Sequence, residues 1–169
     1  RDFLIGRRCI QRCGAMLRVD EHVIRYQGQT ALVMDGVSLC TDDVDYQRFR
    51  RNARNPIYKW CLSHLPLIRR QKLASDWRAK SMSANSNKAS AIMDVNAVAV
   101  DAVMAKHQVE VLIHGHTHRP DQHRVSLGQR IVLGDWHDLG WVISMRGGDF
   151  ALQSFDIDDP NQILTRKQQ

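Results

Sequence analysis

The amino-acid sequence predicts an α/β fold, in which short strands are joined by a connecting helix and interrupted by a helical insertion. Three observations predict it. A mostly apolar run spans residues 109–113, a helical repeat at 91–106 leads directly into that run, and a hairpin pattern occupies 141–155. Strand patterns that alternate with helical patterns are typical of α/β layers.

The region before the insertion reads as a short helix followed by strands. Gly14 is placed as a helix stop, and a Gly28-Gln29 turn separates two of the strands. The last strand ends at Asp35-Gly36, so it delivers a carboxylate into a glycine-containing loop, although a strand-end Asp is also a common turn former. The expected elements are a helix over 3–13 and strands over 16–19, 22–26 and 31–34.

The segment from Val44 to Lys88 has the character of a helical insertion. Thr41 and the acids after it can cap a helix, helical spacing runs to about Ala84, and Pro56 and Pro66 mark breaks. Eleven basic residues stand against two acids here, interleaved with Trp, Tyr, Phe, Leu and Ile. This mixture favours an interfacial surface. A helical subdomain with its own small core and a solvated basic exterior is the alternative.

The chain after the insertion alternates again between helix and strand. The polar stretch 81–88 reads as a linker, or as a set of donors for phosphate and sugar, and Ser90 can cap the following helix. Gly147-Gly148 marks the turn of the closing hairpin. The expected elements are a helix over 91–106 and strands over 109–113, 130–133, 141–145 and 151–155.

Three imidazoles follow the apolar run at 109–113. His116 and His118 are two residues apart, so they can point at one ion or at two adjacent ions, and Gly115 allows a close approach of the main chain. A polar surface loop without an ion is the alternative. The loop follows the carboxyl end of a strand, where α/β sheets bind ligands, and this position favours a metal site. We expect His114 to be either a buried structural group or a group that supports the metal ligands, and leave His137 unassigned.

Composition limits the classes of protein. The chain is 43% hydrophobic with a formal net charge of +6, which suggests acidic partners such as nucleic acid, anionic lipid or a phosphorylated small molecule. It shows no membrane-spanning run and no signal peptide, and it opens at Arg1 without an initiating Met, which suggests a start in mid-protein. Four cysteines without a Cys-x-x-Cys pair predict free thiols in the cytoplasm.

Four separated motifs occur in order along the chain, at residues 39–43, 84–88, 91–96 and 113–120. They read Leu-Cys-Thr-Asp-Asp, Ala-Asn-Ser-Asn-Lys, Ala-Ile-Met-Asp-Val-Asn and Ile-His-Gly-His-Thr-His-Arg-Pro. The last resembles the final motif of calcineurin-like metallophosphoesterases, and together they resemble the UDP-2,3-diacylglucosamine diphosphatase family of lipid A synthesis. The resemblance runs nearly end to end. It implies that residues 1–169 are the C-terminal part of one metallophosphoesterase domain with a four-layered αββα core, and that residues 44–88 are a helical lid insertion.

The same resemblance implies hydrolysis of the pyrophosphate bond of UDP-2,3-diacylglucosamine to lipid X and UMP, with two Mn²⁺ ions. It implies a glycolipid nucleotide substrate and an anionic membrane as partners, without nucleic acid, at the cytoplasmic face of the inner membrane. His116 would also lie near the scissile phosphate as the catalytic residue. The implied metal ligands are Asp35, His116 and His118. The implied substrate contacts are Arg1, Asp43, Ser81, Asn85, Lys88 and His116.

Two departures from the family pattern qualify these roles. The family's Asp-x-His, Gly-Asp-x-x-Asp and Gly-Asn-Arg-Asp motifs supply most metal ligands, and this sequence opens at the Arg-Asp of the third. Asp35-Gly36-Val37 also stands where the family has His-Gly-Asp. We therefore expect this chain alone to be inactive. Two other classes remain open: a non-catalytic remnant of a phosphoesterase, and a basic nucleic-acid-binding module, which the sequence pI of about 9.5 permits.

Overall fold

The computed structural model describes residues 7–16, 18, 20–86, 94–159 and 163–164. The backbone divides into two compact units. One contains residues 1–17 and 41–94, and the other contains residues 18–40 and 95–169. The expected helical insertion falls within the first unit and the strands within the second. Its role as a lid within a single domain stays a prediction.

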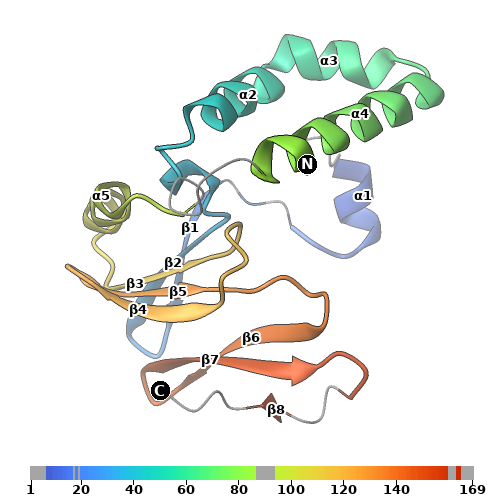
Figure 1. The fold of residues 1–169 in the computed structure, drawn as a ribbon. Helices are drawn as coiled ribbons and strands as arrows, with labels where there is room; N and C mark the ends of the chain where they lie inside the picture. The colour runs from blue at the N-terminus through green and yellow to red at the C-terminus, as the bar shows by residue number, and fades with distance from the viewer. Residues whose placement is uncertain (1–6, 17, 19, 87–93, 160–162, 165–169) are drawn as a thin grey trace. The chain divides into compact units, whose positions relative to one another are not determined.

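The described residues of the second unit form two sheets, one α-helix and the short 3-10 helix η2 (Val37–Leu39) (Figure 1). The larger sheet has five strands, in the spatial order β1 (Glu21–Tyr26), β2 (Gln29–Met34), β3 (Val111–His114), β5 (Gly128–Val132) and β4 (Asp121–Val125). The central strands β2, β3 and β5 run parallel, whereas the two edge strands are antiparallel to their neighbours. Helix α5 (Ala97–His107) leads into β3. The smaller sheet consists of β6 (Leu139–Arg146), β7 (Asp149–Asp156) and β8 (Ile163–Leu164).

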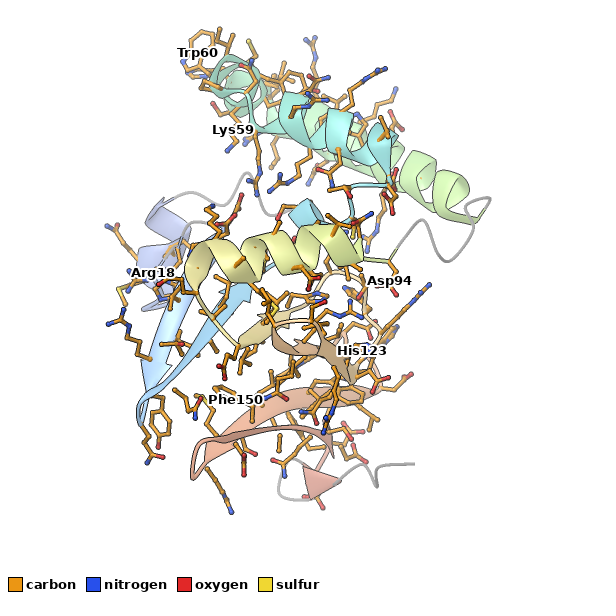
Figure 2. All side chains as sticks on the ribbon, turned by 90° about the vertical axis from the view of Figure 1, so that its left-hand side faces the viewer. Arg18, Lys59, Trp60, Asp94, His123 and Phe150 are labelled. Atoms are coloured by element: carbon orange, nitrogen blue, oxygen red, sulfur yellow. The ribbon has the colours of Figure 1, made fainter. Side chains whose placement is uncertain are left out.

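Alternation of side chains along the central strands forms two cores, one on each face of the larger sheet. Leu32 and Leu112 are fully buried in the core that includes α5. Ile113 and Ile131 point to the opposite face, where they pack with Phe150 of the smaller sheet. Phe150 is labelled in Figure 2. The unit is therefore layered α–β–β, which confirms the α/β class. The described residues of this unit form no second helical layer beyond the smaller sheet.

The first unit is helical, as the sequence predicted. Its elements are α1 (Arg7–Arg12), α2 (Val44–Arg54), α3 (Pro56–His64) and α4 (Leu67–Ser86). Asn55 caps α3, because its side chain accepts hydrogen bonds from two backbone N–H groups of the first turn at 2.9 and 3.3 Å. The rings of Phe49 and Tyr58 pack against Trp77, with centroid distances of 5.8 and 6.3 Å. These contacts give the unit a small core of its own.

Several expected boundaries were wrong. Residues 81–86 continue α4 instead of forming a polar loop. Helix α5 begins at Ala97 because Asn96 caps it, accepting from the N–H groups of Val98 and Ala99 at 2.9 and 3.2 Å; Ser90 lies outside the described residues. The described part of the strand expected at 16–19 is not in a strand. Strands β4 and β8 were not predicted.

Cys13, Cys40 and Cys61 are free thiols, as expected. Among the residues that the structure describes, no helix combines the length and the apolar character needed to cross a membrane.

Candidate functional site

The candidate site lies at the carboxyl edge of the three parallel strands. Met34 of β2 pairs with His114 of β3, and His114 pairs with Val132 of β5. The three strands therefore end side by side, and each continues into a polar loop. The first loop carries Asp35, the second carries His116 and His118, and the third carries residues 133–138. This is the edge at which open α/β sheets bind ligands.

A glycine turn holds the Asp35 loop against the histidine loop. The N–H of Gly115 donates to the carbonyl of Asp35 at 3.1 Å. Gly36 has a positive φ of 103°, and a Cβ at this residue would lie only 2.8 Å from Nδ1 of His114, so the position requires glycine. The Asp35 side chain is exposed, and its Oδ2 accepts from the N–H of Val37 at 3.3 Å. The predicted ligand thus reaches the edge of the sheet with one carboxylate oxygen already used in the turn.

The histidine loop has a strained backbone. His116 and His118 have left-handed φ angles of 65° and 52°, and the N–H of Thr117 donates to the carbonyl of Gly115 at 2.8 Å, which closes a γ-turn around His116. Left-handed conformations cost a residue with a side chain roughly 1–2 kcal/mol. Backbone strain of this kind concentrates at ligand-binding sites.

His114 is the buried group that the sequence predicted. Its side chain is 1% exposed, and its Nδ1 lies 2.9 Å from the carbonyl oxygen of Gly115. The carbonyl of His114 accepts from the N–H of Leu133 at 2.8 Å. This bond extends the pairing of β3 and β5 by one residue and fixes the start of the third loop.

The third loop contains a residue that the sequence analysis did not select. Oδ2 of Asp135 lies 3.5 Å from Nδ1 of His118, and both side chains are more than half exposed. The available signal was a second strand that ends in Gly-Asp, at Gly134-Asp135. That signal pointed to His118 only once β3 and β5 were known to be neighbours.

The donor chemistry of this edge fits a divalent cation, because imidazole and carboxylate groups are common ligands of Mn²⁺ and Zn²⁺. These groups are too few to complete the coordination shell of a metal ion. Among the described residues, no three His, Cys, Asp or Glu side chains lie close enough together to hold a metal ion. The two histidines would therefore need ligands from elsewhere to complete a metal centre.

The predicted substrate contacts other than His116 lie apart from this edge in the sequence. Asp43 directly precedes α2, and its carbonyl accepts from the N–H of Gln47 at 3.0 Å. Ser81 and Asn85 fall within α4. Arg1 and Lys88 lie outside the described residues. The structure thus brings the predicted metal ligands to one edge and leaves the predicted substrate contacts untested.

A second charged cluster joins β1 to α5. Oε2 of Glu21 lies 2.6 Å from both Nζ of Lys106 and Nε2 of His107. These hydrogen bonds, that of Lys106 first, hold the pKa of Glu21 below its ordinary value. A shallow hollow of about 270 Å³ beside the cluster has an apolar floor that includes Leu39 and Val103. None of these residues belongs to the predicted site.

Comparison with known proteins gives clear relatives by sequence. No family model matches the chain. It is 44% identical over 162 residues to the UDP-2,3-diacylglucosamine hydrolase of Azotobacter vinelandii, which covers 94% of this chain and 67% of that protein. Proteins of the same name from Pseudomonas putida and Pseudomonas fluorescens are each 44% identical, over 92% and 97% of the chain and 67% and 68% of their own lengths. The match falls in the C-terminal part of these relatives.

Among solved structures, Vps29 of Entamoeba histolytica in complex with zinc matches with a TM-score of 0.43 and 10% identity. The match covers 86% of this chain and 57% of that chain. A similarity at this level supports no statement about function.

Proposed function

The chain belongs to the UDP-2,3-diacylglucosamine hydrolase family, and we propose that it forms the part of such an enzyme that supplies two histidine ligands of the metal centre. The proposed reaction is hydrolysis of the pyrophosphate bond of UDP-2,3-diacylglucosamine, which releases UMP and 2,3-diacylglucosamine 1-phosphate (lipid X). The reaction belongs to lipid A biosynthesis. The chain spans about two thirds of the length of these relatives, so the activity is proposed for the whole enzyme.

The observation that carries the proposal is the convergence of three strand ends on one edge. Potential ligands follow β2 and β3, and a further carboxylate follows β5. The histidine loop between them has two left-handed residues, and backbone hydrogen bonds join its start to the residues that follow β2 and β5. A solvated surface loop has no need of such a costly and well-fixed conformation.

In the proposed mechanism, His116 and His118 each offer a neutral ring nitrogen to a divalent cation, which we propose to be Mn²⁺, and Asp35 offers an oxygen. When bound, a pair of such ions lowers the pKa of a coordinated water and stabilises charge on the attacked phosphate. The γ-turn at His116 fixes the direction in which its side chain leaves the backbone. We propose that this side chain also contacts the scissile phosphate. Gly115 adds no side chain at this edge, where the phosphate must approach closely.

We also propose that Arg1, Asp43, Ser81, Asn85 and Lys88 contact the nucleotide, diphosphate and glucosamine groups. The charges of Arg1 and Lys88 suit phosphate. Alanine at each position in the whole enzyme is expected to raise KM for the glycolipid. An unchanged KM in all of these variants contradicts this assignment.

We propose that the helical segment 44–88 binds an anionic membrane surface at the cytoplasmic face of the inner membrane. Ile57, Trp60 and Ile68 are 72%, 62% and 79% exposed, and Figure 2 shows Lys59 and Trp60 together on α3. Leu62 is buried and Trp77 packs against Phe49 and Tyr58, so neither belongs to this exposed set. Exposed apolar side chains among cations are typical of an interfacial surface.

Vesicle co-sedimentation tests the membrane proposal. We expect the protein to bind anionic vesicles and to bind them less at high salt. Binding should also fall when Arg69, Arg70 and Lys72 of α4 are changed to Glu. A matched control makes the same charge change at exposed arginines of the second unit, and its binding is expected to fall much less. Equal loss in both variants, or equal binding to neutral vesicles, contradicts the proposal. The test set is Arg69, Arg70 and Lys72, and the control set is Arg25, Arg124 and Arg146.

The catalytic proposal predicts that the 169-residue chain alone releases no UMP from UDP-2,3-diacylglucosamine with Mn²⁺ above the blank rate. The reason is the incomplete donor set among the described residues. Mn²⁺-dependent release that His116→Ala abolishes would show that the chain holds a complete site. The second candidate, a non-catalytic member of the family, is favoured by the Asp35 turn and by Val37, which is buried and offers no polar group.

A further inference from the structure

The pairing of β3 with β5 places Asp135 beside His118. His114 pairs with Val132, and the hydrogen bond from the N–H of Leu133 to the carbonyl of His114 continues that pairing past the end of β5. The two loops therefore leave the sheet as neighbours. Nδ1 of His118 and Oδ2 of Asp135 lie 3.5 Å apart at this point.

Packing behind the third loop fixes the path of the chain into Asp135. A Cβ added to Gly134 would lie 2.3 Å from Nε1 and 2.6 Å from Cδ1 of Trp141. The backbone at Gly134 therefore rests directly on the indole of β6, which itself packs against the core between the two sheets. A side chain carried by such a supported backbone is positioned more closely than one on a free loop.

A carboxylate next to one ring nitrogen determines which nitrogen of a neutral imidazole carries the proton. Nδ1 is the nitrogen of His118 that lies 3.5 Å from Oδ2 of Asp135. A carboxylate at this position favours the tautomer with the proton on Nδ1, which leaves the lone pair on Nε2. Carboxylates of this kind orient histidine ligands in metal sites and raise their basicity. We propose that Asp135 is a positioning residue that holds His118 in the tautomer and orientation in which Nε2 binds the metal.

The metal-binding part of this inference rests on the proposed function, whereas the choice of tautomer does not. A contribution to folding does not explain the pair, because both side chains are more than half exposed and exposed ion pairs stabilise proteins little. Replacement of Asp135 is thus expected to leave the unfolding midpoint unchanged and to change the state of the His118 ring. If the pair had only a structural role, replacement of Asp135 would lower the unfolding midpoint and leave the state of the His118 ring unchanged.

The first test measures the ring of His118 in the metal-free chain by long-range ¹H–¹⁵N spectra of histidine side chains, with His118→Gln used to assign the signals. The parent is expected to show mainly the Nδ1–H tautomer, and Asp135→Ala is expected to lose that preference. Asp135→Asn is expected to retain it, because the amide oxygen still accepts a hydrogen bond. Asp138→Ala, in the same exposed loop, is the matched control and is expected to match the parent. Identical ring spectra in the parent and in folded Asp135→Ala overturn the inference.

The second test adds Zn²⁺, which is diamagnetic, and follows the same ring signals. Loss of an orienting partner commonly weakens metal affinity about 10- to 100-fold, which is the effect expected for Asp135→Ala, with Asp135→Asn close to the parent. If Asn weakens binding as much as Ala does, Asp135 is itself a ligand and the positioning role is wrong. If the tautomer depends on Asp135 but Zn²⁺ moves no His118 signal in any variant, the proposed metal function fails while the tautomer assignment stands.

Discussion

Gly36→Ala is expected to destabilise the second unit through two separable effects. The φ of 103° at this residue disfavours any side chain by roughly 1–2 kcal/mol. The new methyl would also lie 2.8 Å from Nδ1 of His114 and 3.3 Å from the carbonyl oxygen of Gly115. His114 is 1% exposed and has little room to move, so we expect about 1–3 kcal/mol more, as for other overpacked sites. The expected total is about 2–5 kcal/mol.

The matched control is Gly28→Ala in the β1–β2 turn. Gly28 has a φ of 82° and nothing within 4 Å of an added Cβ, so the control carries only the conformational cost of about 1–2 kcal/mol. Urea titration followed by the backbone amide signals of β2 and β3 reports the free energy of unfolding for this unit alone. If the free energy of unfolding falls equally in the two variants, the contact with His114 contributes nothing to the loss of stability. A Gly36→Ala variant as stable as the parent would refute the described geometry of the edge.

Three further variants test the packing around the site by urea unfolding. Glu21→Gln removes the carboxylate shared by Lys106 and His107 and should cost about 1 kcal/mol at neutral pH. Because the pKa of Glu21 is lowered in the folded state, this contribution should be present above pH 4.5 and disappear as the pH falls further; a cost that is constant with pH would contradict it. Asn96→Ala should cost about 1 kcal/mol through loss of the α5 cap, and an unchanged midpoint would argue against the cap. Leu112→Ala, at a fully buried position, should cost about 2–5 kcal/mol, and a cost below that range would argue against its place in the core.

The central features of the fold were predictable because they depend on local sequence patterns. Residues 111–114 are buried, and a strand covered on both faces shows a run of apolar residues. The His loop was expected at a strand end for the same reason. The helical character of 44–86 followed from its spacing and from the positions of Pro56 and Pro66, which stand at the starts of α3 and α4.

Features that depend on the neighbours of a segment were not predictable. Strand β4 reads Asp-Gln-His-Arg-Val, and an edge strand of this polarity gives no hydrophobic signal. Both Ser90 and Asn96 are good helix caps, and the sequence alone does not choose between them. The role of Asp135 depends on His118, which precedes it by 17 residues. The two side chains come close only because β3 pairs with β5.

A chimeric enzyme tests most directly whether this chain supplies the histidine ligands of a hydrolase. The region that precedes the matched part of the Azotobacter vinelandii relative would be joined to Arg1 of this chain, with Asp35→His and Val37→Asp to restore the family pattern. We expect Mn²⁺-dependent release of UMP from UDP-2,3-diacylglucosamine by the chimera and loss of that release in its His116→Ala variant. A folded chimera that releases no UMP, or one that keeps its activity without His116, would contradict the account.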